Sequence, residues 1–294
     1  MSTAPFVPWP ELRTLFFCIG AQKAATTWLA ETLAAAPDVH VARCKEMHFW
    51  NAIGADAARR TSKARRRRAG SLRDAARNIG RPRAALADLR EARMYHDRLR
   101  LRQSLSVPDY ARTLMRGWRG QPVAGEATPN YDGLPVETYQ RMADLHPRTR
   151  FVFVMRDPVD RLWSGLRHKG RRDAAVAGDL NGALAQALDD PDDAHVRRGD
   201  YADVIDRVER GVGADRVSYY FYETLRADAE MARLADFLDV APIRFDPDQR
   251  VNVGSVGIRP DATLWSRART RYAKTYDYVA DRFGGAVPGN WNPA

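Results

Sequence analysis

A lysine lies in a turn of small residues between an apolar run and an amphipathic segment. The stretch 20–28 reads "GAQKAATTW" and follows the apolar residues 16–19. Main-chain N–H groups at the start of a helix, with small side chains around them, bind anions such as phosphate. In a nucleotide-binding P-loop the lysine directly precedes the hydroxyl residue that holds Mg²⁺, but Lys23 comes three positions early and Thr26 stands where that lysine belongs. The segment therefore predicts an anion site without the usual triphosphate geometry, and a lysine on a solvated turn is the alternative.

A second candidate anion site lies in residues 151–168, "FVFVMRDPVDRLWSGLRH". Five apolar residues predict a buried strand, and Pro158 is well suited to the first turn of a helix. Arg156 ends the strand and Ser164 lies about two turns along the helix, so both can face one anion if the helix runs past it. The alternative is a surface ion pair between Arg156 and Asp157, with Ser164 facing solvent.

A third stretch, "CKEMHFW" at residues 44–50, offers a candidate base. Glu46 and His48 lie beside Lys45 and close to aromatic residues. A carboxylate against an apolar wall has a raised pKa, which suits a general base. Glu46 is the preferred base and His48 a competing or supporting one, while an exposed turn with a neighbouring charge pair is the alternative.

These three stretches resemble motifs of the sulfotransferases that use 3′-phosphoadenosine 5′-phosphosulfate (PAPS). The loop looks like their 5′-phosphosulfate loop, the stretch 151–168 like their 3′-phosphate motif, and "CKEMHFW" like the K-E-x-H-F-[FW] segment of the glycan-type members. Residues 197–240 are similar to the C-terminal half of the same family. The resemblance covers most of the chain outside residues 52–105.

The resemblance implies roles for individual residues, with no metal. Glu46 would deprotonate a hydroxyl or amine acceptor, and Lys23 would contact the 5′-phosphate and the sulfuryl group. The PAPS-binding residues would be Lys23, Ala24, Ala25, Thr26, Thr27, Trp28, Arg156 and Ser164, with Arg259 as a weaker candidate in the loop at residues 250–260.

The chain departs from the family pattern at two places. Relatives commonly have glycine after the loop lysine, but this chain has Ala24 and Ala25, which do not easily adopt positive φ, so a different loop shape is expected. In "GEATPNY" Ala127 replaces a lysine found in several relatives. Glu126 and Tyr131 of this segment either line the acceptor side or serve as a cap and a packed aromatic.

The elements that must position these residues alternate between strand and helix patterns. Strands are predicted at 16–19, 39–41, 151–155 and 217–222, and helices at 26–36, 137–145, 200–212 and 228–238. This alternation predicts a P-loop-like, three-layer α/β fold, with a mainly parallel sheet flanked by helices. We expect residues 1–294 to form one domain.

The net charge of +10 is concentrated in one segment. Residues 59–102 carry sixteen Lys or Arg against four Asp or Glu. We expect a helical basic insertion at 52–105 that forms either an acceptor lid, which would favour an anionic acceptor, or a passive solvated face. Neutralising the arginines at 65–68 should raise the acceptor KM in the first case. Two other functions remain open at this point, a P-loop kinase or NTPase and a nucleic-acid-binding protein that uses this segment.

The remaining composition sets broader bounds. No apolar run approaches the length that a bilayer requires, and residues 1–15 lack the pattern of a secretory signal. Two cysteines give no disulfide framework. We therefore expect a cytoplasmic enzyme without a membrane span, whose partner is a small-molecule or saccharide acceptor rather than a nucleic acid.

Overall fold

The computed structural model describes residues 9, 11–44, 46–53, 106–248 and 259–291. The predicted basic insertion at 52–105, including its arginines at 65–68, lies almost entirely outside the described residues, as does Lys45. The lid, its effect on the acceptor and the extent of the domain therefore stay predictions.

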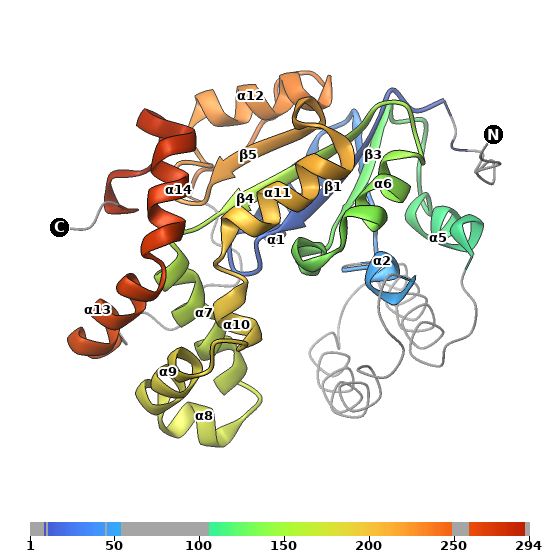
Figure 1. Ribbon diagram of the computed structural model, residues 1–294. Coiled ribbons are helices and arrows are strands. Elements are labelled where there is room, and N and C mark those ends of the chain that lie inside the picture. The colour runs from blue at the N-terminus through green and yellow to red at the C-terminus, as the bar shows by residue number, and fades with distance from the viewer. Residues whose placement is uncertain (1–8, 10, 45, 54–105, 249–258, 292–294) are drawn as a thin grey trace.

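Five strands form one parallel sheet in the order β2-β3-β1-β4-β5 (Figure 1). The strands are β1 (Thr14–Gly20), β2 (Val39–Val41), β3 (Val123–Ala127), β4 (Thr149–Met155) and β5 (Val217–Phe221). All seven residues of β1 are buried, as expected for a central strand that is covered on both faces. The predicted α/β fold is confirmed, and within the described residues every strand pair is parallel.

Helices cover both faces of this sheet. In chain order they are α1 (Thr26–Ala35), α2 (Phe49–Ile53), α5 (Val107–Leu114), α6 (Val136–Ala143), α7 (Pro158–Gly170), α8 (Ala174–Gly178), α9 (Leu180–Asp189), α10 (Ala194–Arg197), α11 (Tyr201–Val212), α12 (Asp228–Leu238), α13 (Ala262–Arg271) and α14 (Ala273–Phe283). Four 3₁₀ turns are η2 (Pro129–Gly133), η3 (Ala214–Arg216), η4 (Gly284–Ala286) and η5 (Gly289–Trp291). Helices α6 and α11 pack together in front of the sheet in Figure 1, and right-handed crossovers place α1 on the opposite face.

The close approach of β3 to β1 requires a glycine. A Cβ placed on Gly125 would lie 2.2 Å from the carbonyl oxygen of Phe16. Gly20, where β1 ends, is equally crowded, because a Cβ there would lie 2.6 Å from Cε2 of Phe153. These contacts set the spacing of the three central strands.

The parallel arrangement brings the segments that follow four of the strands to one edge of the sheet. The carboxyl end of β1 leads into the lysine loop, that of β2 into "ARCKEMH", that of β3 into η2, and that of β4 into Arg156. The chain moves from β1 to one side of the sheet and later to the other, so β1 lies at the switch point where α/β proteins bind ligands. The topology thus gathers the predicted site residues at one place.

None of the helices in the described part of the chain combines the length and the apolar character needed to cross a bilayer. The two cysteines, Cys18 and Cys44, are buried free thiols.

Candidate active site

The loop between β1 and α1 adopts left-handed backbone conformations without any glycine at those positions. Lys23 has φ 77° and Ala25 has φ 56°. Ala24 does not share this conformation; it is buried and donates its N–H to the carbonyl of Ala21 at 3.2 Å. Ala25 therefore adopts the positive φ that alanine reaches only at a cost in free energy. Backbone conformations of this kind concentrate at functional sites, where the surrounding structure holds them in place.

Helix α1 begins directly after this loop. Ala25 is its N-cap residue and has no polar side chain with which to cap the helix. Thr26 is buried and Thr27 half-buried at the first turn. The N–H groups of a first helical turn have no partners within the helix, so this turn suits an anion.

Arg156 connects the second predicted anion motif to the loop. Its Nη1 donates a hydrogen bond to the main-chain carbonyl of Lys23 at 3.2 Å, and its guanidinium lies 4.6 Å from the centre of the Tyr222 ring. Within the described residues its Nε is buried without a hydrogen-bond partner. The structure therefore brings together Lys23 and Arg156, as the sequence predicts for two motifs of one site.

Two residues that the sequence analysis missed extend this cluster. The Arg226 guanidinium lies 4.7 Å from the Trp28 ring centre and 5.7 Å from that of Tyr222. Trp28, a predicted donor contact, is only 1% exposed, and its ring also packs edge-on against Phe245. A run of four aromatic residues at 219–222, at the end of the predicted strand 217–222, was the available signal for Tyr222.

The candidate base Glu46 lies beside His48. Its Oε2 is 3.4 Å from Nε2 of His48, and both residues have positive φ, 53° and 56°. The Glu46 side chain is 42% exposed, so it is accessible to a substrate. Four of the five described non-glycine residues with positive φ thus lie in the two loops that carry the predicted lysine and base.

Asn51, which the sequence analysis also missed, fixes the orientation of His48. Its Oδ1 lies 3.1 Å from Nδ1 of His48, while its Nδ2 donates to the carbonyl of Asn130 at 2.9 Å. Because the amide nitrogen is committed to Asn130, Asn51 presents an acceptor to the imidazole, so Nδ1 carries the proton. The other ring nitrogen, Nε2, then faces Glu46.

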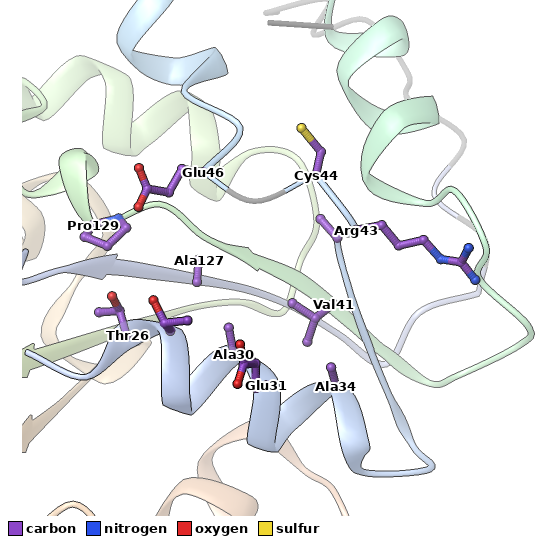
Figure 2. Close-up of a pocket in the computed structure, with 12 residues that line it drawn as sticks. Thr26, Ala30, Glu31, Ala34, Val41, Arg43, Cys44, Glu46, Ala127 and Pro129 are labelled. Atoms are coloured by element: carbon purple, nitrogen blue, oxygen red, sulfur yellow. The ribbon is translucent and has the colours of Figure 1, made fainter. Parts of the chain in front are cut away.

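Glu46 and the start of α1 line the same cleft (Figure 2). Its cavity volume is ≈ 280 Å³. The described lining residues come from α1, from β2 and the segment after it, and from the end of β3: Thr26, Thr27, Ala30, Glu31, Ala34, Val41, Ala42, Arg43, Cys44, Glu46, Ala127 and Pro129. The cleft therefore brings the predicted base and two predicted donor-binding residues to one surface.

Glu126 and Tyr131 do not line this cleft. Glu126 is 1% exposed and accepts hydrogen bonds from the hydroxyls of Tyr110 at 2.5 Å, Thr128 at 2.6 Å and Tyr131 at 3.0 Å. Burial raises the pKa of Glu126, while these hydroxyls lower it. Of the two interpretations of Glu126 and Tyr131, the structure supports packing, and Ala127 and Pro129 are the residues of this segment that line the cleft.

A buried carboxylate accepts a hydrogen bond from the main chain of the lysine loop. Asp132 in η2 is 3% exposed and accepts a hydrogen bond from the main chain of Gln22. Burial raises the pKa of Asp132 to about 6, although the charges of Arg198, Arg161 and Arg207 lower it. Asp132 gave no signal in the sequence because its neighbours come from three distant helices.

Helix α7 brings further groups towards the site. His168 lies one turn after the half-buried Ser164. Burial, followed by the charge of Lys23, lowers the pKa of His168 to about 4, and Glu46 acts in the opposite direction. His168 is therefore neutral at pH 7, and it lies close enough to Lys23 and Glu46 for both charges to affect its pKa.

Arg259, the weakest of the predicted donor contacts, is exposed. Burial raises the pKa of Asp160 on α7, and the charges of Arg156 and Arg259 both oppose that shift. Arg259 thus lies near enough to Asp160 to act on its charge, and it is not among the described residues that line the cleft. Within the described residues, no group of three or more His, Cys, Asp or Glu is placed to hold a metal ion.

Comparisons with known proteins agree with this fold. A sulfotransferase from Alicyclobacillus acidocaldarius superposes with a TM-score of 0.65 at 20% identity, over 95% of this chain and 98% of that one. The sulfotransferase domain of the Synechococcus PCC 7002 olefin synthase gives a TM-score of 0.49 at 16% identity, over 96% and 98% of the two chains. Among curated protein sequences, none matches significantly. The model of the Sulfotransferase family matches residues 16–244, and the chain belongs to this family.

Proposed function

We propose that the protein transfers the sulfuryl group of PAPS to a hydroxyl or amine of a small-molecule or saccharide acceptor. The observation that carries this proposal is the cleft, in which Glu46 faces the first turn of α1. An in-line transfer requires two parts at one surface: a base, and the N-terminus of a helix that binds the anion.

The residues of the loop fit a phosphosulfate group. Lys23 supplies a positive charge, and the N–H groups and hydroxyls of Thr26 and Thr27 supply donors for phosphate oxygens. Arg156 retains a buried Nε without a partner in the described residues and lies next to the loop, which suits a second phosphate group. Ser164 on α7 would complete that site, with Arg259 at its edge.

In the proposed reaction Glu46 takes the proton of the acceptor hydroxyl as the oxygen forms its bond to sulfur. PAPS supplies an activated sulfuryl group, whose bond from sulfur to the bridging phosphate oxygen breaks and leaves its electron pair on that oxygen. Lys23 stabilises the charge that develops there. His48, held by Asn51, lies beside Glu46 and helps to keep its side chain directed at the cleft.

The function can be tested with purified protein, PAPS and a panel of acceptors, by measuring 3′-phosphoadenosine 5′-phosphate (PAP) as the product. We expect PAP to form only when an acceptor is present. A thermal-shift comparison should show stabilisation by PAP and none by ATP with Mg²⁺, because Thr26 stands where a P-loop lysine would hold the triphosphate. Stabilisation by ATP with Mg²⁺ alone would reject the proposal.

A further inference from the structure

The walls of the cleft are mostly small and apolar. Seven of its twelve described lining residues have apolar or weakly polar side chains: Ala30, Ala34, Val41, Ala42, Cys44, Ala127 and Pro129. Burial raises the pKa of the Cys44 thiol to about 12, so it stays uncharged at neutral pH. No aromatic ring is among these described lining residues. Such walls gain free energy by covering a slender aliphatic group, and they offer few partners to a molecule rich in hydroxyls.

The charged residues in the described lining of the cleft are Glu31, Arg43 and Glu46. Glu46 lies at the loop end and Glu31 on the exposed side of α1, whereas Arg43 is directed away from the cavity (Figure 2). The Arg43 side chain packs against the turn after α5, where a Cβ added to Gly117 would lie 2.5 Å from its Nε. Two carboxylates without a cation that points inward, among the described lining residues, oppose a carboxylated or phosphorylated acceptor.

The cleft extends away from the reacting groups along α1. Thr26, Thr27 and Glu46 mark the reacting end, and Ala30 and Ala34 follow at one-turn intervals on the same face of the helix. The rise of the helix from Thr27 to Ala34 is about 10 Å. An acceptor that presents its nucleophile to Glu46 therefore has an open, mostly apolar groove of about this length, with Glu31 at its exposed edge, for the rest of the molecule.

We propose that the acceptor is an uncharged aliphatic alcohol, whose hydroxyl lies at Glu46 and whose hydrocarbon chain lies along Ala30 and Ala34. This inference rests on the proposed function, since it names the acceptor class for the same site. Alkylamines are a poorer match, because an ammonium group must lose a proton before it can attack sulfur.

The first test measures transfer from PAPS to unbranched primary alcohols of increasing chain length. Each added methylene group should lower KM by about threefold until the chain outgrows the cleft, after which KM should level off. Alkylamines and acidic saccharides are the comparison acceptors. A higher kcat/KM for an acidic saccharide, or a KM that does not depend on alcohol length, would overturn the inference.

The second test fills the far end of the cleft. Ala34→Phe should raise KM for 1-octanol at least about tenfold and leave KM for ethanol unchanged, because only the longer chain reaches Ala34. Ala35→Phe is the matched control, since Ala35 is the next residue on α1, is also exposed and does not line the cleft. Equal effects of the two variants would contradict the assignment.

Binding measurements separate this inference from the proposed function. Calorimetric titration of 1-octanol into the protein without donor should show binding that Ala34→Phe weakens and Ala35→Phe does not. If this binding is found but no sulfuryl transfer from PAPS occurs with any acceptor, the ligand class stands and the proposed function fails. If transfer occurs to acidic saccharides only, and 1-octanol does not bind, the proposed function stands and this inference fails.

Discussion

Arg156 donates a hydrogen bond to the main-chain carbonyl of Lys23, 133 positions earlier in the chain, at 3.2 Å. This contact joins the end of β4 to the loop after β1. It exists because β1 and β4 are neighbouring parallel strands whose carboxyl ends meet at one edge of the sheet. The proposed donor site lies at this edge of the sheet. The cleft that contains Glu46 lies beside it, along α1.

Replacement of Arg156 by Met should weaken binding of PAP about 10- to 100-fold, because a charge-assisted hydrogen bond to phosphate contributes about 1.5–3 kcal/mol. Isothermal titration of PAP measures the effect. Arg150→Met is the matched control, since Arg150 is on β4, the strand that Arg156 follows. Its guanidinium also lies over an aromatic ring, that of Phe237, and donates to a carbonyl, that of Asp215. A variant at Arg156 with the PAP affinity of the wild type would remove Arg156 from the donor site.

Replacement of Glu46 by Gln should reduce kcat by about 10²- to 10⁴-fold with PAP affinity unchanged, because the amide keeps the shape of the side chain but cannot take the acceptor proton. Turnover and PAP titration on the same preparation separate the two effects. Glu137→Gln, at an exposed position on α6, should leave both quantities unchanged. Near-normal turnover of the Glu46 variant would assign the base to another group.

Variants of Asn51 test whether the orientation of His48 affects kcat. Asn51→Ala removes both the acceptor for His48 and the donor to Asn130, so kcat should fall by up to about tenfold while PAP affinity stays the same. Asn51→Asp can still accept from His48 but cannot donate to Asn130, and an intermediate kcat is expected. Asn181→Ala, which removes an acceptor for the N–H of Asp261 far from the cleft, is the control. Equal kcat values for all three variants would show that this bridge has no role in turnover.

The buried Asp132 should make stability depend on pH. Its pKa of about 6 in the folded protein exceeds the ordinary value of 3.8, so between these values the folded state binds more protons than the unfolded chain. Its contribution to stability is therefore highest below the ordinary pKa and falls as pH rises towards 6. The side chain introduced by Asp132→Asn does not titrate. The free energy of unfolding of this variant, relative to that of the wild type, should therefore increase as pH rises across this window, by roughly 3 kcal/mol at most, and stay level above it. Urea unfolding of both proteins between pH 4 and pH 8 measures the difference, and a constant difference would contradict the raised pKa.

Much of the fold can be predicted from local patterns. The apolar run at 151–155 lies in β4, and the predicted strand 217–222 extends one residue beyond β5. The helix patterns at 200–212 and 228–238 match α11 and α12 within one residue. The run at 16–19 underestimates β1, which extends from Thr14 to Gly20, because the threonine is buried between two strands and its polarity hides it from a hydrophobic pattern. Burial by neighbouring strands is a tertiary property, so the pattern alone cannot give the ends of the strand.

The sequence by itself determined where the candidate donor loop, the Arg156 motif and the Glu46 segment lie, because each is a short run whose residue types and spacing are local. Only the tertiary structure decided which groups surround them. Asn51 on α2 contacts Asn130 in η2, which is distant in the chain, and Asp132 is surrounded by arginines from α7, α11 and the end of α10. The cleft exists only because α1 packs beside β2 and β3. Contacts between segments far apart in the chain depend on how the sheet is ordered, and that order is fixed by the packing of the whole core.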